Sequence, residues 1–115
     1  MKQRIDLSPV RNFLESKARN AWLEIGQYDV YLRRAFHIIE HEMVNTLDLA
    51  NVQNNCDYYG GFWEIYSGVC KLGKEFGFSH LYLECTHNKR LRDAYVARGC
   101  ILIPGDDHNL YKRFE

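Results

Sequence analysis

The sequence lacks several features that would narrow its function at once. It has only two prolines, no Cys-x-x-Cys pair, and no internal repeat or low-complexity tract. No stretch approaches the roughly 20 apolar residues that span a bilayer, and no secretory leader opens the chain. We therefore expect neither a membrane-spanning segment nor a secreted protein.

The sequence also lacks an excess of charge of either sign. Lys and Arg together number 15, and so do Asp and Glu, which gives a formal net charge of zero. Because nucleic-acid and membrane-surface binders carry a basic excess, this balance argues against both classes. What is present is a hydrophobic fraction of 46% in 115 residues, which is typical of one folded domain spanning 1–115.

The four cysteines are spread through the chain rather than clustered. They are Cys56, Cys70, Cys85 and Cys100, and three lie inside apparent strands or helices, where a thiol behaves as a small core residue. We expect them to be reduced in a cytoplasmic protein. Cys85 and His87 alone are weak evidence for metal, so no metal site is predicted.

Hydrophobic periodicity predicts the secondary structure of the first half of the chain. Apolar residues at three- and four-residue steps indicate an amphipathic helix over 8–25, so that residues 1–26 form an N-terminal helix and 28–114 a core. Val, Tyr, Phe and Ile predict a strand over 28–39, and a second strand follows over 43–53. The short polar turn between them predicts an antiparallel hairpin.

The second strand contains a break in its alternation. Leu47 and Leu49 alternate with Asp48, but Ala50 directly follows Leu49 as another apolar residue. A one-residue change of phase in a strand indicates a β-bulge, whereas the alternative is a strand that ends at Leu49.

The second half alternates helix and strand. Apolar spacing predicts a helix over 62–76 that ends at Gly77, a strand around Leu81 and Leu83, and a short helix capped by Asn88. Two short strands are predicted in the tail around a Pro-Gly-Asp-Asp turn. A strand–helix–strand crossover over 47–85 implies a right-handed parallel pair, and the fold class is therefore α/β (α+β), with a mixed sheet and flanking helices.

The spacing of four residues in the second half resembles a known family. Asn88, Leu91, Tyr95 and Gly99 match the pattern of the GCN5-related N-acetyltransferase (GNAT) superfamily, with Cys100 where Phe is usual. The resemblance covers about residues 28–114. It implies a mostly antiparallel acyl-CoA N-acyltransferase-like sheet, acetyl-CoA as co-substrate, and an amine acceptor, either a small molecule or a protein N-terminus or lysine.

The resemblance also implies roles for individual residues. Glu84 matches a catalytic base that acts through water, and Tyr95 matches the acid that protonates the departing thiolate. The backbone of Asn51 and Val52 would hold the thioester and the pantetheine arm beside the bulge, and Asn88 would contact that arm. Gly60, eight residues after Val52, and Gly61 would cradle the pyrophosphate at a helix N-terminus.

The pyrophosphate loop departs from the family pattern. Asp57 replaces Arg or Gln, and Phe62 replaces a small residue; the first repels a phosphate and the second adds bulk. These departures favour an alternative function, an inactive GNAT-fold binding or interaction protein that has lost acetyl-CoA. A nucleic-acid-binding module using Lys89, Arg90, Arg92 and Arg98 is the third possibility, disfavoured by the zero net charge.

The region before residue 28 resembles a shortened front end. Full acetyltransferases of the superfamily have a strand and two helices there, so this chain resembles compact, phage-type members. Exposed aromatics, namely Tyr58, Tyr59 and Trp63, suggest a homodimer. Asp48 is a second candidate base, and His37 and His41 are expected at the surface.

Overall fold

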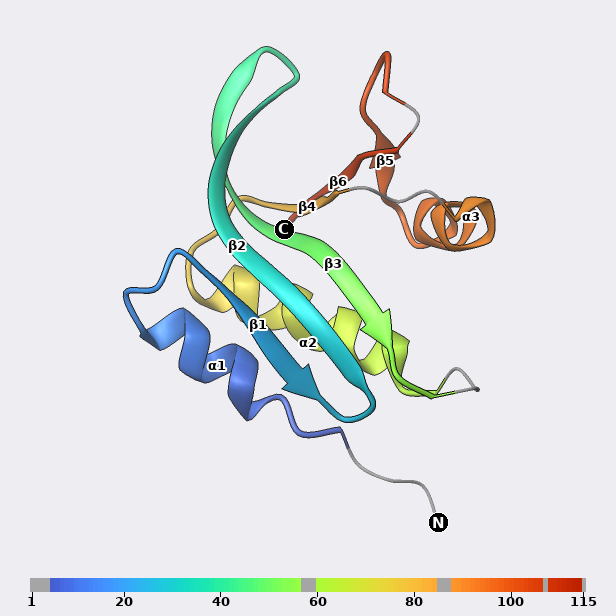
Figure 1. The fold of residues 1–115 in the computed structure, drawn as a ribbon. Helices are drawn as coiled ribbons and strands as arrows, with labels where there is room; N and C mark the ends of the chain where they lie inside the picture. Colours follow the sequence, from blue (N-terminus) through green and yellow to red (C-terminus); the bar gives the residue numbers. More distant parts are fainter. Residues whose placement is uncertain (1–4, 57–59, 85–87, 107, 115) are drawn as a thin grey trace.

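The computed structural model describes residues 5–56, 60–84, 88–106 and 108–114 (Figure 1). The elements along these residues are α1 (Ser8–Glu15), β1 (Asn20–Ile25), β2 (Tyr28–Ile39), β3 (Glu42–Asn54), α2 (Phe62–Glu75), β4 (His80–Leu83), α3 (Lys89–Ala97), β5 (Ile101–Leu102) and β6 (Leu110–Arg113). The six strands form one sheet in the order β1-β2-β3-β4-β6-β5. This mixed, mostly antiparallel sheet confirms the predicted fold class.

The β2–β3 hairpin is the longest feature of the sheet. Its two turn residues, Glu40 and His41, have φ angles of 53° and 70°, the left-handed conformation that a tight two-residue hairpin turn requires. The predicted bulge is confirmed as well. Tyr31 pairs with Asn51 and Leu32 pairs with Leu49, so Ala50 has no partner in the register.

The predicted crossover is also confirmed. β3 pairs with β4 in parallel through Thr46–Leu49 and His80–Leu83, and α2 connects them. β4 then pairs antiparallel with β6, and β6 with β5. The two predicted tail strands therefore form an antiparallel pair at one edge of the sheet.

The helix predicted over 8–25 is wrong beyond Glu15. Asn20–Ile25 is a strand that pairs with β2 in register from Asn20↔Arg33 to Ile25↔Tyr28. Leu23 and Ile25 turn toward the core while Trp22 and Glu24 are exposed. The apolar residues of this segment fit a helical and an alternating pattern equally well. The segment forms a strand because the edge of β2 offers hydrogen-bond partners to its backbone.

The main core lies on one face of the sheet, under α1 and α2. Val10 and Phe13 of α1 pack with Ile65 and Val69 of α2 against Leu32 and its neighbours in the strands. α3 joins this side because Tyr95 contacts the rings of Phe62, Trp63 and Tyr66. The opposite face carries a small cluster of Ile39, Tyr82 and Tyr111 and a polar network described below.

Candidate functional site

A cleft opens where β3 and β4 separate. Their parallel pairing ends at Leu49↔Leu83, and the Glu84 amide still donates to the Leu49 carbonyl at 3.3 Å. Beyond Leu49, where the bulge at Ala50 lies, β3 continues to pair with β2 but no longer with β4. The resulting cleft has a volume of about 1080 Å³ and lies between the two strands, the N-terminus of α2 and one side of α3.

Six of the seven site residues expected from the sequence line this one cleft. They are Asn51, Val52, Gly61, Glu84, Asn88 and Tyr95. Gly60 is described but is not among the lining residues. Asp57, Tyr58, Tyr59 and Cys85 lie outside the described residues, so the expectations for their side chains are not addressed. The predicted residues that line the cleft lie far apart in the sequence, from Asn51 to Tyr95. They come together because the bulge in β3, the crossover helix α2 and α3 all border the same cleft.

The N-terminus of α2 faces the cleft through Gly61, Phe62 and Trp63. Gly61 caps the helix with φ 79°, and no side chain makes a capping hydrogen bond to its first turn among the described residues. The first-turn N–H groups and the positive end of the helix dipole form an anion-binding arrangement. The ring of Phe62 packs on Tyr28 and Tyr95, at centroid distances of 5.9 and 6.2 Å, so its bulk joins the aromatic cluster.

α3 begins and ends as its sequence predicts. Asn88 Oδ1 accepts a hydrogen bond from the Leu91 amide at 3.1 Å, which confirms its role as N-cap. At the other end Gly99 has φ 92°, and the Cys100 amide donates to the Tyr95 carbonyl at 3.1 Å. This pattern is a Schellman motif. The two caps fix the short helix beside the cleft and turn Tyr95 toward the core.

Tyr95 is the most buried of the predicted site residues. Only 3% of it is exposed, and burial raises the pKa of its hydroxyl, with Cys100 and Cys70 adding to the shift. A tyrosine with a raised pKa keeps its proton at neutral pH. Tyr95 therefore carries a neutral hydroxyl rather than a phenolate.

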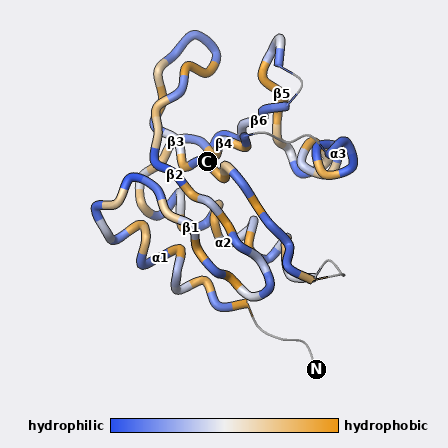
Figure 2. The backbone as a smooth tube through the Cα atoms, in the orientation of Figure 1, coloured by the Kyte–Doolittle hydropathy of each residue, from blue (hydrophilic) through white to orange (hydrophobic). Residues whose placement is uncertain are grey.

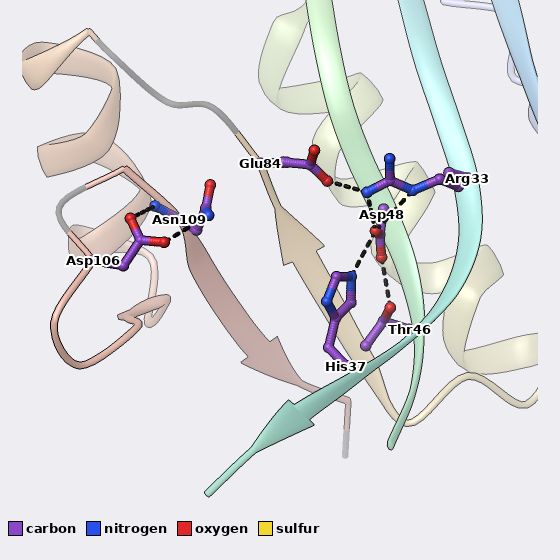
Figure 3. A network of polar contacts seen from close by, with 7 residues as sticks. All are labelled: Arg33, His37, Thr46, Asp48, Glu84, Asp106 and Asn109. Carbon is purple, nitrogen blue, oxygen red and sulfur yellow. Dashed lines mark hydrogen bonds and ion pairs between the residues drawn. The ribbon is translucent and has the colours of Figure 1, made fainter. Parts of the chain in front are cut away.

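Glu84 is joined to a polar network on the opposite face of the sheet (Figure 3). Its carboxylate forms an ion pair with Arg33, and Arg33 in turn contacts Asp48 at 2.8 Å. Asp48 is completely buried and also accepts from Thr46 Oγ1 at 2.5 Å and contacts His37 Nε2 at 2.8 Å. Glu84 is thus partly buried and held in place by its ion pair with Arg33.

Arg33 is the network residue that sequence reasoning missed. Arg33 and Arg34 are adjacent in β2, and their side chains point to opposite faces: Arg33 contacts Asp48, whereas Arg34 donates to backbone carbonyls at the end of α1. Burial opposes the charge of Arg33, but Asp48 and Glu84 outweigh it and raise its pKa. The alternation of β2 and the acidic residue at 48 in the partner strand were the available signals. His37, expected at the surface, is partly buried and stacks on Tyr82 at 3.7 Å.

Two further groups at the cleft were not predicted as site residues. Arg90 lines its mouth from the first turn of α3, where its positive charge faces any anionic ligand. Trp63 lines the wall, and the Arg98 guanidinium lies 3.4 Å from the centroid of its ring. No group of three or more His, Cys, Asp or Glu in the described part of the chain is arranged to hold a metal ion, and none of the described helices is long and apolar enough to cross a membrane.

With its bulged strand, crossover helix and cleft between diverging parallel strands, the chain has a GNAT-like fold. A similar solved structure is that of AtaT, a toxin, in a Tyr-to-Phe mutant form bound to the C-terminus of the antitoxin AtaR and acetyl-CoA. The TM-score is 0.58 at 14% sequence identity, over 76% of this chain and 59% of the AtaT chain. This chain thus matches about three-fifths of AtaT. No family model and no curated protein sequence matches it.

Proposed function

We propose that this protein is an acetyl-CoA-dependent N-acetyltransferase. The observation that carries the proposal is the convergence of Glu84, Tyr95 and the N-terminus of α2 on one cleft of about 1080 Å³. A cleft of this volume suits an elongated cofactor arm. The presence of acetyl-CoA in the AtaT structure supports the same cofactor here.

Acetyl-CoA would bind with its pyrophosphate at the N-terminus of α2. Gly61 lines the cleft there, and the first-turn amides of the helix would donate to the anion. The backbone of Asn51 and Val52 would hold the thioester and the arm along the splayed part of β3, with Asn88 on the other wall. Arg90 adds positive charge at the mouth.

The chemistry follows from the two side chains that line the cleft. The acceptor nitrogen attacks the thioester carbonyl carbon, the carbon–sulfur bond breaks, and an amide forms. The proton lost by the amine passes through water to the Glu84 carboxylate, and the Tyr95 hydroxyl protonates the departing thiolate. Arg33 holds the Glu84 carboxylate, and burial raises the pKa of Tyr95, so its hydroxyl is protonated at neutral pH.

The acceptor is an amine, either a small molecule or the N-terminus or a lysine of a protein. AtaT is bound to a protein segment as well as to acetyl-CoA, which supports a protein partner as one candidate here. The alternative function, a binding module without cofactor, makes a clear contrary prediction. Such a protein would bind neither acetyl-CoA nor CoA.

Titration calorimetry with acetyl-CoA and CoA is the first test, with Trp63 emission as an independent readout because Trp63 lines the cleft. We expect micromolar binding. Absence of heat and of an emission change at millimolar cofactor would refute the proposal and favour the binding module.

Release of free thiol with a panel of amines then tests the two roles. We expect Glu84→Gln and Tyr95→Phe each to lower turnover about 100-fold or more while acetyl-CoA still binds. Glu75→Gln and Tyr111→Phe are matched controls outside the cleft, since Glu75 pairs with Arg11 on the surface and Tyr111 donates to Glu40. Full turnover in both cleft variants would show that the roles are wrong.

A further inference from the structure

The β2–β3 hairpin extends beyond the rest of the sheet as an arm (Figure 1). β1 covers the edge of β2 only as far as Asn20↔Arg33, and β4 covers β3 only from Thr46 onward. Residues 35–39 of β2 therefore pair with β3 on one side and, among the described residues, with nothing on the other.

The outward backbone groups of this edge are those of Phe36 and Ile38. The amide of Arg34 points outward, because it donates to the Arg19 carbonyl beside β1 at 2.8 Å. Since backbone groups alternate in direction along a strand, the N–H and C=O of Phe36 and Ile38 point the same way. They form a short row of donors and acceptors with strand geometry.

This edge has none of the usual protection against pairing. Natural edge strands are shielded by charged side chains, proline, a bulge or shortness. Residues 35–39 read Ala-Phe-His-Ile-Ile, with no Lys, Arg, Asp, Glu or Pro among them, and the bulge of the hairpin lies in β3 at the other end. By contrast, the edge strand β1 carries an exposed Glu24, and β5 is two residues long.

Large apolar side chains accompany the free edge. Phe36, Ile38 and Met43 are 71%, 68% and 61% exposed, and they lie on one face of the arm because Ile38 pairs with Met43. Figure 2 shows the hydrophobic stretch next to the hydrophilic turn at the end of the hairpin. Exposed apolar groups gathered in this way mark an interaction surface.

We propose that this edge pairs antiparallel with the same edge of a second copy of the chain. A two-fold axis at His37 would place Phe36 of each copy opposite Ile38 of the other, so that the outward groups of both exchange hydrogen bonds. The β2–β3 hairpins of two protomers then form a four-stranded sheet, and the pairing closes without leaving a further free edge of this strand.

The charges at the two ends of the edge favour a second copy as the occupant. The tip of the hairpin is acidic, with Glu40 and Glu42, whereas the base beside β1 is basic, with Arg19 and Arg34. Antiparallel pairing brings the tip of each copy to the base of the other, which juxtaposes opposite charges twice. Parallel pairing would bring like charges together.

The surface area buried between the two copies sets the expected affinity of the dimer. Three partly exposed apolar side chains and a short ladder from each copy bury less than the roughly 1,200 Å² of a standard interface. The dimer is therefore a weak one that forms reversibly in the micromolar range. The cleft lies at the opposite ends of β2 and β3, so this inference is independent of the proposed function.

Sedimentation equilibrium of the full chain from about 1 µM to 1 mM tests the inference. We expect the mass to rise from 13.6 kDa toward twice that value, and Ile38→Lys to keep it at the monomer mass. Val96→Lys is the matched control, because Val96 is 46% exposed on α3, away from the arm. It should leave the dimer intact.

Amide hydrogen exchange of the wild-type chain gives a second readout that needs no variant. The amides of Phe36 and Ile38 should become protected as concentration rises. The amide of Leu102 at the β5 edge should not; it points away from β6, because the next amide, that of Ile103, donates inward to the Asn109 carbonyl. A monomer at 1 mM, or a dimer that persists in Ile38→Lys with fast exchange at Phe36, would overturn the inference. Acetyl-CoA binding by Ile38→Lys should equal that of the wild type if the proposed function holds, whatever the state of association.

Discussion

At the scale of single residues, Asp48 is the buried acidic member of the polar network. It is fully buried and contacts Arg33, His37 and Thr46. Replacing one member of a buried ion pair leaves the other uncompensated, so Asp48→Asn should lower the free energy of unfolding by about 3 kcal/mol. Chemical denaturation measures this loss.

Asp93→Asn is the matched control, because its pair with Lys89 is exposed and such a pair contributes about 0.5 kcal/mol. Equal losses in the two variants would show that the network does not stabilise the fold.

At the scale of an element, α3 combines a structural and a proposed binding role at its N-cap. Asn88→Ala should cost about 1 kcal/mol of stability, because the Leu91 amide loses its acceptor. Asn88→Asp keeps an acceptor there and should preserve stability, but it adds negative charge to the cleft and should weaken binding of the anionic acetyl-CoA. Denaturation and calorimetry on both variants separate the two roles. If Asn88→Asp bound acetyl-CoA as tightly as the wild type, Asn88 would be a cap alone.

At the scale of the whole molecule, the sheet should lose stability on acidification through His80 in the central strand β4. Burial lowers the pKa of His80 below the ordinary 6.5, and Arg113 lowers it further. The unfolded chain therefore takes up this proton before the folded one, so the contribution of His80 is complete above pH 6.5 and is lost as pH falls through the folded pKa. His80→Gln should show a smaller fall in unfolding free energy between about pH 6.5 and pH 5. An unchanged slope would mean that other groups dominate.

Much of this arrangement could be predicted because its signals are local. The change of phase at Ala50 is a one-residue event that leaves the same trace in any strand, and the bulge lies there. Asn88 and Gly99 satisfy backbone groups within one turn of their own helix, so their roles do not depend on distant residues. The positions of the cleft residues followed from these elements, whereas their chemical roles rest on the resemblance and on the proposed tests.

The strand Asn20–Ile25 was mispredicted as helix because its apolar side chains suit a helix and a strand equally. The choice depends on whether a neighbouring strand offers backbone partners, and only the folded sheet supplies β2 in the required register. Arg33 escaped prediction for the same reason. Its partners Asp48 and Glu84 lie 15 and 51 residues away, and the pairing with Asp48 becomes visible only once the register between β2 and β3 is known.

The sequence by itself determined the strands from β2 onward, the bulge, the crossover helix and the caps of α3, because each depends on interactions within a few residues or on alternation along one element. Only the tertiary structure decided that the strand before β2 forms, that Glu84 is tied to Asp48 through Arg33, and that the arm of β2 is left with an open edge. These features depend on which segments become neighbours across the sheet, and that is settled by the register between strands rather than by any segment alone.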